Sequence, residues 1–183
     1  GFGMQTIVNN FLSGLILIFS RTLHEGDVID VGNLQGVVRK ISVRATTVET
    51  FDNAIIFVPN SEFVSNRLIN WTRNGRIVRR EVAIGVAYGT DPKLVERLLV
   101  EVAQSVPQIV RRPQPFVLFM DFADSTLNFV LRYWSDIGTA TDAASAIRHR
   151  IVEVFAEHQV EIAFPQLDVH VIPQTPSLTR AEG

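Results

Sequence analysis

Histidine is the side chain in this sequence with most scope for chemistry near neutral pH, as a general acid or base or as a metal ligand. The four histidines are His24, His149, His158 and His170. None belongs to a His-Glu-x-x-His motif, and no two stand at the spacing of a metal-binding pair. We therefore interpret them as ordinary surface or partly buried residues.

Other catalytic patterns are equally weak. The chain has no cysteine, which excludes disulfides, thiolate zinc sites and cysteine nucleophiles. No serine occupies a Gly-x-Ser-x-Gly turn. Gly1-x-Gly3-x-x-Thr6 is an incomplete dinucleotide-binding pattern with no strand before it. The sequence thus predicts no enzyme, no metal site and no cofactor.

Charge argues against nucleic acid as a partner. The formal net charge is −2 and the sequence pI is about 6.1, whereas phosphate binding needs clustered, uncompensated basic residues. The pairs Arg79-Arg80 and Arg111-Arg112 are too short to indicate a binding site by themselves, and we interpret them as solvated surface.

The first 20 residues are uncharged and mostly apolar, and the first charge is Arg21. An α-helix needs about 20 such residues to cross a bilayer. Polar residues recur mostly at three- and four-residue steps and include Gln5 and Asn9, so one side of this helix is wettable. We expect residues 1–22 to be the remnant of a membrane helix in a fragment of a longer protein. A buried helix of a soluble core is the alternative.

Residues 23–73 change to short alternating strands separated by turn residues, which is typical of a small all-β unit. Strands are expected at 27–31, 36–41, 45–50, 54–58 and 67–72. Asp52-Asn53 predicts a hairpin turn, and Asn60 is expected to cap a short helical turn. Five strands and one helical turn predict a small barrel.

Residues 74–173 are expected to form a second unit that contains both strands and helices, and residues 73–79 are expected to connect it to the first. Its expected order is strand, helix, strand, strand, helix, strand, the ferredoxin-like arrangement. Asp91-Pro92 is expected to begin the first helix and Thr141-Asp142 the second, and the final strand is expected at 168–172. Residues 174–183 are expected to be a disordered tail.

Motifs in a fixed order resemble the carboxy-terminal half of MscS-like small-conductance mechanosensitive channels. The matching motifs are Gln5, Asn10 and Gly14, Gly26-Asp27, Gly36-Val37-Val38, Val58-Pro59-Asn60, Ile69-Asn70-Trp71, Gly85-Val86-Ala87-Tyr88 with Asp91, and Phe164-Pro165-Gln166-Leu167-Asp168-Val169. Arg44-Ala45-Thr46-Thr47 and Leu68-Ile69-Asn70-Trp71 look closer to the larger, potassium-dependent (MscK-like) members. The resemblance implies an α+β fold: a pore-lining helix, a five-stranded Sm-like β-barrel and a ferredoxin-like α/β domain.

The resemblance also implies a homo-oligomeric ring of about seven subunits around a pore. Phe2 falls at the position of an apolar gating residue, where a ring of such side chains blocks ions by dewetting. Thr6 occupies the position of a bend where the family has glycine. Since threonine is stiff, the bend is expected at Gly3 or Gly14, or is shallower.

Two further pairs take roles from the resemblance. Met4 and Val8 match positions that transmit movement from neighbouring membrane helices. Asn10 and Ser61 match a contact between the helix and the barrel, although Ser61 replaces a glycine. Each has a simpler interpretation: Phe2 as a lipid-facing or core residue, and Asn10 as a hydrogen-bonding residue at any helix interface.

The resemblance therefore implies a pore-forming subunit in the bacterial inner membrane, with the barrel and the α/β domain in the cytoplasm. It would open under membrane tension to release ions and small solutes in osmotic downshock, with membrane lipid and further copies of itself as partners. The alternative is a membrane-tethered or soluble oligomeric interaction module without transport activity, because small barrels and ferredoxin-like domains serve many functions.

Overall fold

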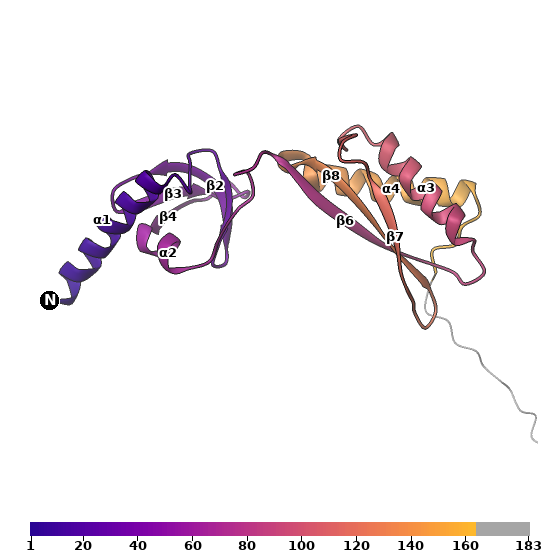
Figure 1. Ribbon diagram of the computed structural model, residues 1–183, viewed down its shortest axis with the longest axis horizontal. Helices are drawn as coiled ribbons and strands as arrows, with labels where there is room; N and C mark the ends of the chain where they lie inside the picture. The colour runs from indigo at the N-terminus through magenta and orange to yellow at the C-terminus, as the bar shows by residue number, and fades with distance from the viewer. Residues whose placement is uncertain (164–183) are drawn as a thin grey trace, which may run out of the picture.

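A computed structural model describes residues 1–163, in which a long helix leads into two β-sheets joined by a narrow connection (Figure 1). The strand expected at 168–172, the tail at 174–183, the last of the matching motifs and His170 lie outside the described residues. The elements are α1 (Phe2–Ser20), β1 (Val28–Val31), β2 (Leu34–Ile41), β3 (Ala45–Glu49), β4 (Ile55–Pro59), α2 (Asn60–Ser65), β5 (Leu68–Asn70), β6 (Ile77–Val86), α3 (Pro92–Ser105), β7 (Phe116–Phe122), β8 (Leu127–Asp136), the 3₁₀ turn η1 (Ile137–Thr139) and α4 (Ala140–Glu157).

The five strands predicted after α1 form a single antiparallel sheet in the order β4-β3-β2-β1-β5. The predicted hairpin between β3 and β4 is confirmed, with Asn53 at a φ of 63°, a conformation that asparagine tolerates well. Inward side chains from all strands except β5 build a buried core with Phe63 of α2 and Leu17 of α1. The helix α1 is therefore packed onto the β region.

The prediction that Asn60 caps α2 is wrong. Pro59 occupies the N-cap position, and no side chain caps the helix. Asn60 is instead the first residue of α2, and its fully buried side chain bonds to the β2–β3 region. The cap preference of asparagine is a local tendency, and here tertiary hydrogen bonds outweigh it.

The second sheet has the order β6-β8-β7, and both long helices α3 and α4 cover one of its faces (Figure 1). Every second residue of β8 is buried, as expected for a strand with one face on a core. The predicted start of α3 is confirmed: Asp91 accepts a hydrogen bond from the Lys93 amide at 3.0 Å, and Pro92 is the first helical residue.

Two predicted boundaries in this region are wrong. β6 begins at Ile77, inside the expected connection at 73–79, because residues 77–79 pair with residues 134–136 of β8. Backbone pairing outweighs their polar composition. Similarly, α4 begins at Ala140 after η1, so Thr139 and not Thr141-Asp142 stands at its N-terminus.

The element order agrees with the ferredoxin-like prediction over the described residues. After α4, the chain returns to the free edge of β6, where Ile162 forms an antiparallel bridge with Val86. The Ala87 amide also donates to the Glu161 carbonyl at 3.0 Å. The molecule is thus α+β, with an N-terminal apolar helix, a β domain and an α/β domain.

Candidate functional site

The helix α1 is long and apolar enough to cross a membrane, by its length and composition. Its buried residues are Ser13, Gly14 and Leu17, all on one side. Large apolar side chains elsewhere on it are exposed, with Phe2 at 90% and Phe19 at 79%. Such a surface on a monomer indicates contact with lipid or with another protein surface.

Gly14 brings the backbone of α1 against the β domain. A Cβ atom built on Gly14 would lie 2.5 Å from Asn60 Nδ2 and closer still to the Val43 carbonyl oxygen. Any larger residue would therefore have to push α1 away from the β2–β3 turn. Gly14 was predicted as a bend position, whereas the structure gives it a close packing contact within an unbroken helix.

Asn60 connects α2 to the same turn through three hydrogen bonds. Its Oδ1 accepts from Thr46 Oγ1 at 2.9 Å, and its Nδ2 donates to the Ser42 carbonyl at 2.8 Å. Its backbone amide donates to the Arg44 carbonyl at 3.0 Å. Because Asn60 and Thr46 are both fully buried, these bonds replace water and hold α2 and the turn in one arrangement.

Asn10 adds a polar contact one helical turn before Gly14. Its Oδ1 accepts a hydrogen bond from the Ser61 backbone amide at 3.0 Å. The structure thus brings together the two residues proposed as a contact between helix and barrel. The replacement of glycine by serine leaves the contact intact, because the bond uses the Ser61 backbone.

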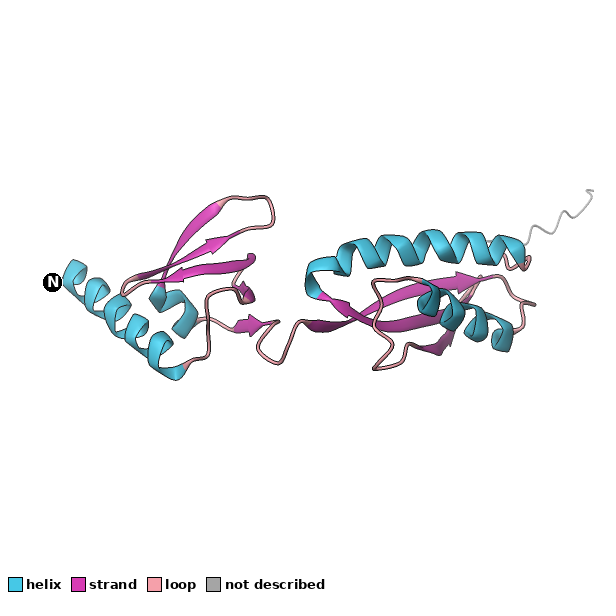
Figure 2. Ribbon diagram, turned by 90° about the horizontal axis from the view of Figure 1, so that it is seen from above, coloured by secondary structure: helices cyan, strands magenta, loops and turns pink. Residues whose placement is uncertain are grey.

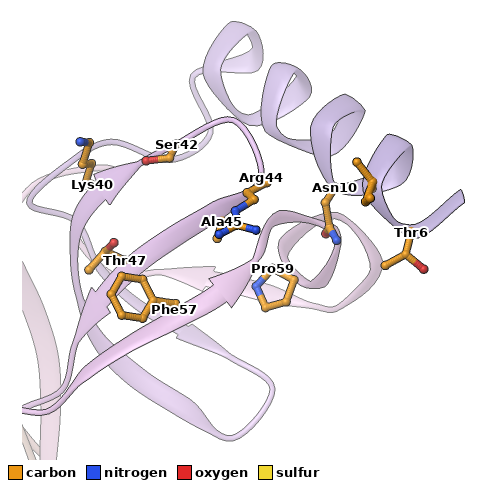
Figure 3. Close-up of a pocket in the computed structure, with 10 residues that line it drawn as sticks. Thr6, Asn10, Lys40, Ser42, Arg44, Ala45, Thr47, Phe57 and Pro59 are labelled. Carbon is orange, nitrogen blue, oxygen red and sulfur yellow. The ribbon is translucent and has the colours of Figure 1, made fainter. Parts of the chain in front are cut away.

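A cavity of about 670 Å³ opens beside these contacts, between α1 and the outer side of the β sheet (Figure 3). Thr6, Ile7 and Asn10 line it from α1, and Phe57 and Pro59 from β4. The remaining lining residues belong to β2, β3 and their turn: Lys40, Ser42, Arg44, Ala45 and Thr47. The cavity borders the contact between α1 and α2, because Asn10 both lines it and accepts the hydrogen bond from the Ser61 amide.

The remaining predicted residues lie on the free part of α1. Phe2 is at its beginning, and Met4 and Val8 line a shallow groove on one side. The helix passes through Gly3 and Thr6 without a break, and Thr6 Oγ1 donates to the Phe2 carbonyl at 3.3 Å. The gate, bend and coupling roles of these residues stay predictions.

Several titratable groups in the described part of the chain form structural contacts. Within residues 1–163, no three His, Cys, Asp or Glu residues are placed to bind a metal ion. Arg76 contacts Asp136 through two hydrogen bonds of 3.0 Å, Nε to Oδ2 and Nη2 to Oδ1. This ion pair and the Gly138 amide lower the pKa of Asp136. The pair ties the beginning of β6 to the end of β8.

Two family models match the chain in sequence order. One, described as the β-domain of a mechanosensitive ion channel, matches residues 6–73, and the other, described as the C-terminal part of the mechanosensitive ion channel MscS, matches residues 81–162. The chain belongs to the MscS-like family of mechanosensitive channels. We call the contacts of Asn10 and Gly14 with Asn60 and Ser61 the docking site of α1. This docking site lies within the first of the two matches.

Individual relatives of this MscS-like chain agree with that assignment. An uncharacterized MscS family protein of Haemophilus influenzae is 44% identical, and the mechanosensitive channel MscK of Escherichia coli is 38% identical, both over 172 residues. Each alignment covers 93% of this chain but 16% and 15% of these relatives. The closed-state crystal structure of Helicobacter pylori MscS has a TM-score of 0.84 and 27% identity, covering 94% of this chain and 68% of that one.

Sequence reasoning missed two features of the MscS-like docking site. Asn60 was expected to cap a short helical turn, whereas its side chain forms buried hydrogen bonds with Thr46 and Ser42. Arg44 and Lys40 were not considered as lining residues, because nothing in a linear sequence shows that β2 and β3 face α1 across a cavity. Gly14 was selected, but for flexibility and not for close packing.

Proposed function

We propose that this chain is part of the pore-forming subunit of a mechanosensitive channel that opens under membrane tension. Membership of the MscS-like family supports this function, and one observation carries it: α1 docks on the β domain through Ser13, Gly14 and Leu17 while its other sides stay exposed. A helix held in this way has apolar and polar surface to offer to lipid, to other copies and to a water-filled path.

In this proposal, several copies enclose the pore. One amphipathic helix cannot surround water, but about seven related by a rotation axis can, each turning one side inward. Phe2 stands at the free end of α1, where a ring of phenylalanines would form an apolar constriction. Such a constriction blocks ions by dewetting, without a charge or a plug. Because threonine is stiff at position 6, the helix would bend below the gate at Gly3 or Gly14, or would bend less sharply.

Tension selects the open state because that state occupies more membrane area. The helices that sense tension would act on α1 through Met4 and Val8, both exposed in the groove on its side. The Asn10–Ser61 hydrogen bond would then pass the movement to the β domain. Released ions and small solutes would relieve osmotic downshock.

The proposed organisation follows the same division of the chain. Residues 1–22 form the membrane helix, residues 23–73 the β domain and residues 74–173 the α/β domain. The protein would lie in a bacterial inner membrane, with lipid and further copies as partners and both folded domains in the cytoplasm. We propose neither catalytic activity nor nucleic-acid binding.

Cell survival tests this function. The full-length protein would be produced in bacteria that lack their own mechanosensitive channels, which would then be moved abruptly from high to low osmolarity. We expect survival to rise well above that of cells with the empty vector. Survival equal to the vector control, with the protein present in the membrane, would contradict the proposal and favour an interaction module without transport activity.

The proposed assembly has its own test. The absolute mass of the full-length protein in mild detergent should correspond to one homo-oligomer of about seven copies. A uniform monomer or dimer would contradict the ring.

A further inference from the structure

The cavity between α1 and the β domain carries two positive charges. Lys40 of β2 and Arg44 of the β2–β3 turn line it, and its lining contains no aspartate or glutamate. Both side chains belong to exposed residues. Within residues 1–163, neither side chain forms an ion pair or a hydrogen bond.

Two acidic residues on or beside the same strands have partners of their own. Glu49 of β3 forms an ion pair with Arg39, with 2.6 Å between Oε2 and Nε. Glu25 Oε1 accepts a hydrogen bond from the Ile41 amide at 3.4 Å. The charges of Lys40 and Arg44 are therefore not compensated by these acids. Since two like charges close together attract anions, the cavity favours an anionic ligand.

An aromatic ring lies in the same cavity. In the register of the sheet, Thr47 is opposite Lys40 on one side and opposite Phe57 on the other, so the three side chains share one face. This is the outer face, because the alternate residues Thr46 and Val48 are buried. Phe57 is 72% exposed, so its ring has surface free for stacking (Figure 3).

The helix α1 lines the other side of the cavity. Thr6 and Asn10 lie one helical turn apart there, and Ile7 adds apolar surface between them. Figure 2 shows that α1 and the β domain lie together at one end of the molecule, with the α/β domain at the other. A ligand in this cavity would contact both α1 and the β domain, and it would bind best while α1 is docked.

We propose that this cavity binds a nucleoside monophosphate. Its phosphate group would lie on Arg44 and Lys40, because a guanidinium group binds phosphate oxygens through two hydrogen bonds and an ammonium group adds a second charge. Its base would stack on Phe57. The volume of about 670 Å³ falls in the range of about 300–1,000 Å³ that is typical of small-molecule sites.

The headgroup of a phospholipid is a second source of phosphate. A phosphate monoester carries a charge of about −1.5 to −2 near pH 7, which matches the two cations of the cavity. The phosphodiester of a lipid carries a single negative charge, and it has no flat ring to cover Phe57. Charge and shape therefore favour the free nucleotide, and the experiment separates the two sources.

Equilibrium dialysis with labelled adenosine monophosphate tests this inference. The full-length protein would be held in nanodiscs of phosphatidylcholine. We expect a Kd between about 10 μM and 1 mM. The double variant Lys40→Gln, Arg44→Gln should weaken binding by about tenfold or more, because both charge-assisted contacts are lost. Phe57→Leu keeps apolar surface but loses the ring, and it should weaken binding by about threefold or more.

Controls separate the two parts of the ligand and the site. Arg67→Gln removes an exposed arginine of the β domain outside the cavity and should leave the Kd unchanged. Adenosine, which lacks the phosphate, and inorganic phosphate, which lacks the ring, should each bind more weakly than the nucleotide. Lys40, Arg44 and Phe57 are exposed, so the variants should fold.

Three outcomes would overturn this inference. The first is the absence of nucleotide binding at millimolar concentration, and the second is a Kd that the double variant leaves unchanged. The third is complete loss of nucleotide binding at the same salt concentration when the nanodiscs contain phosphatidylglycerol, which would assign the cavity to a lipid headgroup. Dialysis needs no current, so each of these results would leave the proposed channel function intact.

Discussion

Thr46 and Asn60 share a buried hydrogen bond: Thr46 Oγ1 donates to Asn60 Oδ1 at 2.9 Å, and neither residue has exposed surface. The bond joins β3 to the beginning of α2, directly under the point where Gly14 of α1 contacts the β domain. The position of α1 on the β domain therefore depends on a polar arrangement that water cannot replace.

Replacing Asn60 by alanine should destabilise the β domain by about 1–3 kcal/mol, because Thr46 Oγ1 and the Ser42 carbonyl would lose their partner in a buried site. Urea denaturation, followed by tryptophan fluorescence in a Trp134→Phe background so that Trp71 alone reports, would measure the change. Asn74→Ala, at an exposed position, is the matched control and should change stability by less than about 0.5 kcal/mol. Equal effects of the two variants would contradict the role of Asn60.

Gly14→Ala should destabilise the docking of α1, by about 1–3 kcal/mol, because the new methyl group would overlap the Val43 carbonyl and Asn60. Gly3→Ala is the matched control: no atom outside the helix lies within 4 Å of its Cβ position, so alanine should stabilise the helix by up to about 1 kcal/mol. Thermal melting followed by circular dichroism in detergent would compare them. A melting temperature raised by both substitutions would show that α1 does not pack as described.

Asn10→Ala should expose the Ser61 amide to solvent exchange. The lost hydrogen bond is 3.0 Å long, and a bond of about 1 kcal/mol corresponds to roughly fivefold faster exchange of that amide. Hydrogen–deuterium exchange of the peptide that contains Ser61 would detect this change. Asn9→Ala, one position earlier and exposed, should leave the rate as it is. Unchanged exchange in Asn10→Ala would mean that another group protects the amide.

The Arg76–Asp136 ion pair predicts a pH dependence of stability. The hydrogen bond from Arg76 is the main cause that holds the pKa of Asp136 below its usual range in the folded state, and the hydrogen bond from the Gly138 amide adds to it. The contribution of ionised Asp136 to folding stability is therefore fully present above the pKa of the unfolded state, about 3.9. It is lost as the pH falls through the lower pKa of the folded state. Since both side chains are substantially exposed, the pair should contribute less than about 1 kcal/mol.

Melting temperatures across pH 2–7 would check this ion pair at about half-unit steps. Asp136→Asn keeps an oxygen for the Gly138 amide but loses the charge, so the wild type should melt higher near neutral pH and the difference should vanish in acid. Asp52→Asn, in an exposed turn, is the control and should show no such difference. If the wild type and Asp136→Asn still differ in melting temperature at the acid end, the difference comes from packing and not from charge.

Much of the fold could be predicted from short-range patterns. Alternation gave the strands of both sheets, and Asp91-Pro92 gave the start of α3, because both signals depend on neighbours in sequence. The beginning of β6 could not be predicted in this way. Ile77-Val78-Arg79 lies in a strand only because the end of β8, more than fifty residues later, offers backbone partners.

The candidate site was predicted unevenly for the same reason. The resemblance selected Asn10 and Ser61, and the structure brings them into contact. The role of Asn60 depends on Thr46 and Ser42, which reach it only through the fold.

Phe2 is the residue on which the gating proposal depends most. It is 90% exposed at the beginning of α1, an unfavourable position for a phenylalanine unless lipid, a water-excluding constriction or another copy covers it. Serine at this position would remove the apolar ring and keep the pore wet. Phe19→Ser, at the opposite end of the helix and 79% exposed, is the control for loss of an exposed aromatic residue.

Patch recordings under controlled suction test the central claim most directly. The full-length protein in liposomes should give stepwise currents that appear above a threshold of tension and disappear when it is released, and Phe2→Ser should open at lower tension or without it, whereas Phe19→Ser should keep the threshold. Silence of the wild-type protein up to the tension at which the membrane ruptures, with the protein shown to be inserted, would contradict the account.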